Sequence, residues 1–336
     1  MSGMVFHAPL LHSNEGFEIS AIAERNKSLS REKYVYPRLV RSFDELLADQ
    51  EIELIIVNTP DPLHYEQTKR AIQAGKHVVV EKPFTQKFSE ATELIELANK
   101  SNLVLTVFQN RRWDGDFLTV QKVIRDKMLG RLVSYESRFD RYRNYIQENT
   151  WKEEQVTGAG IVYNLGSHLI DQVLVLFGNP NYVNAEIKTL RTSGKVDDFF
   201  HIQLEYNKNI SISVGGSMLV REPLPRYALH GTDGSFLKWG NDPQEQDLRD
   251  GKIPGQEGWG KENEVNWGLL NKVEKGEKFR GPIETIPGNY QLFYDGLYNA
   301  IRNKTEVPVN AMEAALVIKV INAAFESGRK GKKITI

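Results

Sequence analysis

The chain has 336 residues, with 43 basic and 44 acidic side chains, a formal net charge of -1 and no cysteine. Its length exceeds the size at which one hydrophobic core stops growing, so two domains are expected. The balanced charge, with no basic block among aromatics, indicates neither a nucleic-acid nor an anionic-membrane partner, and the lack of cysteine excludes disulfides, thiolate metal sites and a cysteine nucleophile.

The first residues and the hydropathy give no targeting signal. No apolar run approaches the length of a membrane span, and residues 1–11 lack a basic leading region and carry His7 and Pro9 inside their short apolar stretch. We therefore expect a cytoplasmic protein with a small-molecule partner.

The first 110 residues alternate apolar strands with helices. Strands are predicted over 17–23, 53–58, 78–80 and 103–108, and helices over 42–48, 63–74 and 90–100. Ser42 and Glu45 have the spacing of a capping box, and Gly75 ends the second helix. This alternation predicts right-handed crossovers and a parallel sheet.

The N-terminal segment departs from the usual dinucleotide-binding pattern. That fold needs a first strand, a glycine-rich turn and a helix whose N-terminus takes the pyrophosphate. The chain opens with Met1-Ser2-Gly3, and Gly3 matches only the last glycine of such a turn. We expect a sheet that lacks its central first strand. The alternative is an ordinary leading helix over 1–12, in a fold that never had the strand.

After residue 110 the pattern changes to strands without long helices between them, which predicts an α/β domain with a large, open, antiparallel or mixed sheet. We place the domains at 1–110 and 111–336 and expect the last helices to pack back on the first domain. Strands are predicted over 132–142, 185–190, 199–206, 210–214 and 226–230, helices over 117–128, 161–177, 290–301 and 312–327, and a loop over 241–263.

Lys82 is the first candidate for chemistry. It follows three consecutive valines and Glu81, and it precedes Pro83, so it lies at the carboxyl end of a buried strand, where open α/β sheets bind their ligands. A partly desolvated lysine is a common catalytic group. The alternative is a strand end at which two charges return to water.

A polar segment, 109–114, follows the next strand at the same edge. Its Arg111 suits a polyhydroxylated or anionic substrate, and the alternative is a salt-bridge patch between domains. Tyr142 and Trp151 would line a sugar-sized pocket, although aromatic residues more often serve packing alone.

The helix over 161–177 carries the second candidate group. Asn164 and His168 are four residues apart and share one helix face, while Gly158 and Gly160 permit close backbone approach at its start. Asn164 can orient the ring of His168, although a lone helical histidine is usually structural.

Cofactor preference is expected to depend on the end of the first strand. Glu24 there suits a ribose diol and so NAD, whereas Arg25 and Lys27 suit a 2′-phosphate and so NADP. We expect use of both cofactors.

Taken together, the chain resembles the glucose-fructose oxidoreductase and inositol dehydrogenase family, and within it the NADP-linked scyllo-inositol dehydrogenase branch. The likeness runs over essentially the whole chain. It is carried by Asn58-Thr59-Pro60 with His64, by Ala74 to Pro83, by Asn110 to Phe117 and by Leu165 to Gln172.

The resemblance implies a Rossmann domain followed by an α/β domain whose open sheet forms the contact of a homodimer or homotetramer. It implies that Lys82 and His168 are catalytic and that Arg111 belongs to the substrate pocket. Two features differ from the family. The family's first strand and the first two glycines of its phosphate loop are absent, and the position of Asn164 is commonly an aspartate in the family. The residues that the resemblance places on the nicotinamide side are Thr59, Pro60, His64, Glu81 and Pro83.

We therefore expect an NAD(P)-dependent dehydrogenase acting on a cyclic polyol or sugar. His168 would take the hydroxyl proton, Lys82 would stabilise the developing negative charge, and Asn164 would hold the imidazole ring, with no metal needed. The rival expectation is a catalytically silent binding or regulatory protein that has lost cofactor binding.

Overall fold

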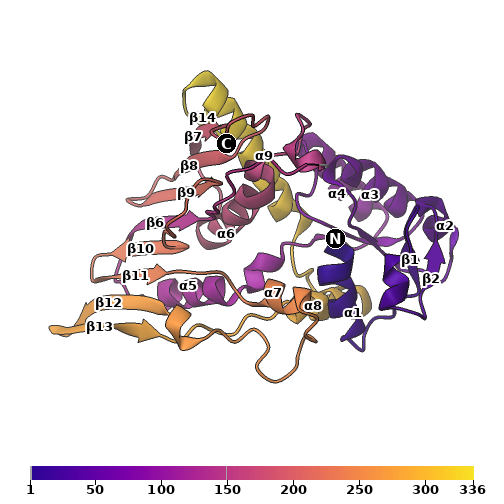
Figure 1. Cartoon of the computed structure of the whole chain (residues 1–336), viewed down its shortest axis with the longest axis horizontal. Helices are drawn as coiled ribbons and strands as arrows, with labels where there is room; N and C mark the ends of the chain where they lie inside the picture. The colour runs from indigo at the N-terminus through magenta and orange to yellow at the C-terminus, as the bar shows by residue number, and fades with distance from the viewer. Residues whose placement is uncertain (1, 149) are drawn as a thin grey trace.

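A computed structural model describes residues 2–148 and 150–336 of the chain. Figure 1 shows two units: a smaller one that contains β1 to β5, and a larger one built on a broad sheet from β6 to β14. The predicted fold class, a Rossmann-type domain followed by an α/β domain with a large mixed sheet, is confirmed.

The first unit contains parallel strands connected by helices, as the alternating pattern predicts. Buried valines and isoleucines fill β3 and β4, and the register aligns Ile55 with Val78 and Val57 with Val80. Its strands are β1 (Ala21–Ala23), β2 (Arg38–Val40), β3 (Leu54–Val57), β4 (His77–Val80) and β5 (Leu105–Val107). Its helices are η1 (Gly3–His7), α1 (Ala8–His12), η2 (Leu29–Glu32), α2 (Phe43–Ala48), η3 (Asp61–Leu63), α3 (His64–Gln73) and α4 (Phe88–Lys100).

The sheet of the first unit is split. β1 pairs with β2, and β3 pairs with β4 and β4 with β5, but among the described residues no strand lies between β1 and β3. A cavity of about 890 Å³ occupies this place, lined by both strands and by residues of the N-terminal helix. The split falls where the usual strand order puts the first strand.

The second unit is organised by a nine-stranded sheet in the order β13-β12-β11-β10-β6-β9-β8-β7-β14, in which only β6 and β9 run parallel among these neighbours. Alternate residues of β8, such as Phe200 and Ile202, are buried, because one face of the sheet packs on helices. The strands are β6 (Leu132–Arg138), β7 (Tyr182–Lys188), β8 (Phe199–Glu205), β9 (Ser211–Ser217), β10 (Tyr227–Gly231), β11 (Gly234–Lys238), β12 (Gly268–Glu274), β13 (Glu277–Ile283) and β14 (Ile334–Thr335). The helices are η4 (Asn110–Trp113), α5 (Gly115–Arg125), η5 (Trp151–Glu153), η6 (Val162–Gly166), α6 (Ser167–Phe177), α7 (Gln244–Arg249), η7 (Glu264–Asn266), α8 (Gln291–Arg302) and α9 (Ala311–Lys330).

The sequence pattern missed part of this sheet. Strands β11, β12 and β13 were not predicted, and the expected loop over 241–263 contains α7. The β12–β13 hairpin turns at Lys275 and Gly276, both with positive φ, and β13 is largely exposed. Without a buried apolar face, β13 has no hydrophobic alternation that a sequence pattern could detect.

The closing helices contact the first unit. The hydroxyl of Tyr294 on α8 lies 2.6 Å from His7 Nδ1 on η1, and Thr106 Oγ1 on β5 donates to the carbonyl oxygen of Val309, just before α9. Figure 1 shows α9, in yellow, between the large sheet and α4. The division of the chain at residue 110 stays a prediction.

Candidate active site

Lys82 connects the two units. Its ammonium donates to the backbone oxygen of Asn164 at 2.8 Å and lies 3.3 Å from the side-chain oxygen of the same residue. Burial lowers the pKa of Lys82 to about 7, against the charge of Glu81 and helped by the positive charge of Lys152. A lysine with this pKa changes its charge near neutral pH.

Glu81 next to it belongs to a group that the sequence pattern did not reveal. His7 Nε2 lies 3.1 Å from the Glu81 carboxylate, and the hydroxyl of Ser2 donates to the same carboxylate. Burial alone would raise the pKa of Glu81, but the bonds to His7 and Ser2 and the charge of Lys82 lower it to about 2. The N-terminal helix is thus attached to the carboxyl end of β4.

His168 lies on α6 and is only 5% exposed, and its Nδ1 has no hydrogen-bond partner among the described residues. Burial lowers its pKa well below the usual value, and the charges of Lys82, Arg111, Arg226 and Arg141 act in the same direction. The imidazole is therefore neutral at neutral pH and can accept a proton.

Asn164 differs from expectation. It precedes His168 by four residues, but its side chain points to Lys82, and no hydrogen bond joins it to His168 in the described structure. Asn164 lies in the π-helical turn η6, just before α6 begins at Ser167, and its side-chain oxygen accepts from Lys82 of the first unit. The predicted role of Asn164 in holding the ring is thus replaced by a contact with Lys82.

Glycines place the start of this helix. Gly158 and Gly160 have φ values of +90° and +87°, and a Cβ at either position would collide with the carboxylate of Asp61 or Asp197. Asp61, which follows Pro60, is another residue that the sequence pattern did not single out. Burial raises the pKa of Asp61 to about 6, against the charge of Lys82.

Among the residues expected on the nicotinamide side, His64 connects the segment that follows β3 with the segment that follows β4. His64 Nδ1 lies 2.8 Å from the carbonyl oxygen of Pro83, and its Nε2 lies 2.9 Å from that of Thr59. Pro60 is the residue directly before the short helical turn η3. These contacts bring the carboxyl ends of β3 and β4 together beside Lys82, where a nicotinamide ring would lie.

Glu24 directly follows β1 and is bound by its own loop, since its carboxylate accepts hydrogen bonds from the amides of Leu29 and Ser30 at 2.9 and 2.7 Å. Arg25 is exposed, and its side chain makes no ion pair with the described residues. The sequence pattern missed Arg41, whose guanidinium donates to the carbonyl oxygens of Glu24 and Lys27 at 3.0 and 2.6 Å and so shapes this loop.

The residues present fit a nicotinamide dinucleotide. Gly3 opens the N-terminal helix so close to Asn58 that any Cβ there would collide with its side chain. Gly3 thus lets the start of the N-terminal helix approach the end of β3 closely, and a helix N-terminus is where a phosphate group would bind. Thr59 and Lys82 would flank the nicotinamide, and the loop of Glu24 would face the adenosine ribose.

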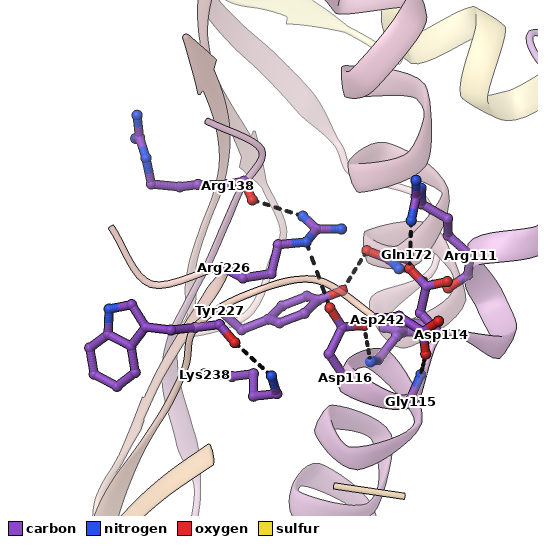
Figure 2. A network of polar contacts seen from close by, with 12 residues as sticks. Arg111, Asp114, Gly115, Asp116, Arg138, Gln172, Arg226, Tyr227, Lys238 and Asp242 are labelled. Atoms are coloured by element: carbon purple, nitrogen blue, oxygen red, sulfur yellow. Dashed lines mark hydrogen bonds and ion pairs between the residues drawn. The ribbon is translucent and has the colours of Figure 1, made fainter. Parts of the chain in front are cut away.

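Arg111 contacts two carboxylates. Its guanidinium donates to Asp114 at 3.0 Å (Figure 2) and to Glu245 at 2.6 Å, and the side chain of Gln172 donates to its carbonyl oxygen. In this structure Arg111 therefore makes salt bridges, which was the alternative to a substrate contact. Its Nε has no partner among the described residues, so a role in substrate binding stays a prediction.

The two aromatic candidates differ in exposure. Tyr142 is 50% exposed, and the guanidinium of Arg221 lies 5.4 Å from its ring centroid. Trp151 is half-buried at the start of η5. Substrate contact by either residue stays a prediction.

In residues 2–148 and 150–336, no group of three or more histidine, aspartate or glutamate side chains is arranged to hold a metal ion. The same part of the chain has no helix with the length and hydrophobicity needed to span a membrane.

Comparison with known proteins gives consistent matches. Residues 1–109 match the oxidoreductase family's NAD-binding Rossmann fold, and residues 121–336 match the C-terminal α/β domain of the same family, Gfo/Idh/MocA. The whole chain is 39% identical to scyllo-inositol 2-dehydrogenase (NADP(+)) IolW of Bacillus subtilis and covers 93% of that protein.

Solved structures agree. A putative oxidoreductase from Bacteroides fragilis is 47% identical, with a TM-score of 0.92, over 100% of this chain and 96% of that one. The putative oxidoreductase YvaA from Bacillus subtilis is 38% identical, with a TM-score of 0.96, over 100% of this chain and 95% of that one. The chain therefore belongs to the Gfo/Idh/MocA family of NAD(P)-dependent oxidoreductases.

Proposed function

We propose that the protein interconverts a secondary alcohol and a ketone on a cyclic polyol or sugar, with NADP or NAD as hydride partner. The observation that carries this proposal is the contact of Lys82, just past β4, with Asn164, four residues before a buried His168 whose pKa the charge of Lys82 helps to lower. The likeness to scyllo-inositol 2-dehydrogenase (NADP(+)) of Bacillus subtilis supports it.

His168 acts as the proton acceptor. Its lowered pKa keeps the ring neutral, and its Nδ1 is not used by any described residue, so it can take the proton of a bound hydroxyl group. Removing that proton raises the electron density on the oxygen and so favours loss of hydride from the adjacent carbon. The bound nicotinamide supplies the hydride acceptor.

Lys82 stabilises the oxygen. An ammonium has three N–H groups; two are directed to oxygens of Asn164, which leaves one for the substrate oxygen. Because both Asn164 oxygens are neutral, the lysine charge is not cancelled at the point where negative charge develops. Arg111, Tyr142 and Trp151 would contact the hydroxyl groups of the substrate.

Cofactor binding and turnover test the proposal. The protein should quench or shift NADPH fluorescence on titration and oxidise at least one cyclic polyol or sugar, with loss of turnover in His168→Ala. Cofactor binding without turnover, on a panel of inositols, aldoses and their acids, would contradict the proposed activity. Absence of cofactor binding would favour a silent binding protein.

The proposal includes a homodimer or homotetramer formed through the exposed face of the nine-stranded sheet. In β8, His201 and Gln203 alternate with the buried residues and point to that face. Light scattering of the purified protein should give twice or four times the chain mass, and a monomer at micromolar concentration would contradict this part.

A further inference from the structure

Three guanidinium groups surround the ring of Phe139, which follows β6 and is only 4% exposed. Their central carbons lie 4.4 Å from the ring centroid for Arg226, 5.1 Å for Arg111 and 5.4 Å for Arg141. Such stacking is favourable for each cation, but it also brings three like charges together. Each charge therefore needs a counter-charge.

Two of the three arginines have one. Arg111 is paired with Asp114 and Glu245, and Arg226 lies 3.8 Å from Asp116. The side chain of Arg141, in contrast, makes no ion pair and no hydrogen bond with residues 2–148 and 150–336.

Arg141 is nevertheless fixed in place. Its amide donates to the carbonyl oxygen of Ser217 at 2.8 Å, and its carbonyl oxygen accepts the amide of Val220 at 3.0 Å. The residue is half-buried, and burial together with the charges of Arg143 and Arg111 lowers the pKa of Arg141 to about 10. A cation partly withdrawn from water without a counter-ion is costly.

The unmatched positive charge lies close enough to the proposed catalytic groups to influence them. The positive charges of Arg141 and Lys82 both lower the pKa of His168. The positive charge of Lys152 likewise lowers the pKa of Lys82. Of the carboxylates near this group, Glu81 and Glu245 already hold other partners, which leaves Asp61 to balance one cation.

The buried ends of the other two arginines also offer donors. Arg226 uses two of its nitrogens for the Arg138 carbonyl oxygen and for Asp116, and its Nη2 has no partner among the described residues (Figure 2). Arg111 Nε is likewise unsatisfied. Buried donors without acceptors are uncommon in folded proteins.

We propose that the substrate is a polyhydroxylated carboxylic acid, such as a sugar acid, and that Arg141 binds its carboxylate. This inference rests on the proposed function and names the substrate class for the same site. A guanidinium presents two parallel N–H groups that match a carboxylate, which makes the pairing directional as well as charge-compensating.

Matched substrate pairs test the inference. Glucose with glucuronate and galactose with galacturonate differ only at carbon 6, so the ratio of their kcat/KM values isolates the carboxylate. The wild type should prefer the acid by about 10- to 100-fold, the range of a charged hydrogen bond. In Arg141→Gln the ratio of kcat/KM for the acid to kcat/KM for its neutral partner should fall to about one, chiefly through a higher KM for the acid.

Arg138→Gln is the matched control. Arg138 is close in sequence, but its guanidinium is already paired with Asp140 and Glu136, so its loss should leave the preference intact. Circular dichroism and thermal melting would verify that both variants fold. Arg141→Lys keeps the positive charge but loses the two parallel N–H groups of the guanidinium, so its preference for the acid should be intermediate.

Three outcomes would overturn the inference. They are a preference of the wild type for the neutral sugar, a greater preference for the sugar 6-phosphate than for the uronate, and an unchanged preference in Arg141→Gln. The first two leave the proposed dehydrogenase activity in place. If no sugar is turned over, calorimetric titration with glucuronate decides: binding that Arg141→Gln abolishes supports the inference, and equal or absent binding overturns it.

Discussion

The ammonium of Lys82 donates to the backbone oxygen of Asn164 at 2.8 Å and lies 3.3 Å from its side-chain oxygen, joining two segments 82 residues apart. Both oxygens are neutral. They accept two of the three N–H groups of the lysine but give no charge to offset its burial, and the pKa of Lys82 accordingly falls to about 7.

Asn164→Asp should therefore act on Lys82. A carboxylate at this distance favours the charged lysine and typically raises its pKa by ~1 to 3 units. The loss of kcat/KM on the alkaline side should move to higher pH by a similar amount. Asn164→Ser, which keeps a neutral oxygen, is the control. An unmoved alkaline limb in a folded Asp variant would show that Lys82 does not set that limb.

Lys82→Ala should lower turnover by ~100-fold or more, the usual cost of removing one donor from a developing oxyanion. The fold should survive, because the loss removes a buried charge whose partners are neutral oxygens. Steady-state kinetics with a thermal melt check this. Near-normal turnover in a folded Lys82→Ala protein would leave the lysine with a structural role only.

Glu24→Ser should raise the kcat/KM of NADP relative to NAD, because it removes a negative charge from the loop that would face the ribose. The carboxylate also accepts the amides of Leu29 and Ser30, so the variant should melt at a slightly lower temperature. Measuring both cofactors in parallel separates the two effects. An unchanged cofactor ratio with a lower melting temperature would assign Glu24 to the loop alone.

A designed apolar strand, fused ahead of Gly3 through a two-glycine turn, should fill the place between β1 and β3. It would give both strands a hydrogen-bonding neighbour and would place turn amides at the start of the N-terminal helix, so cofactor affinity and melting temperature should both rise. A polar extension of equal length is the control. If both fusion proteins bind the cofactor with equal affinity, the cavity is not the place of a missing strand.

The sequence predicted the parts of the fold that have strong periodicity. The buried valines of β4 placed Lys82 correctly at a strand end, because a run of apolar residues followed by charges has few other interpretations. The helix that carries His168 was predicted from the regular spacing of its apolar residues.

Other features depended on contacts that no local pattern contains. The bond of Lys82 to Asn164 joins residues 82 positions apart, and the contact of His7 with Glu81 joins residues 74 positions apart. The stacking of Arg111, Arg141 and Arg226 on Phe139 likewise brings together four separate positions of the chain.

The pH dependence of kcat/KM for alcohol oxidation by the wild type tests the central claim most directly. If His168 is the base and Lys82 the charged donor, activity should fall on the acid side only below the usual range of histidine, because burial lowers the pKa of His168. On the alkaline side it should decline as pH rises through about 7, where Lys82 loses its proton. Asp61→Asn, measured alongside, removes a carboxyl group whose pKa burial raises to about 6 and which the charge of Lys82 reaches. A kcat/KM that instead rises through pH 7 would contradict this account, because the deprotonated lysine would then be the base.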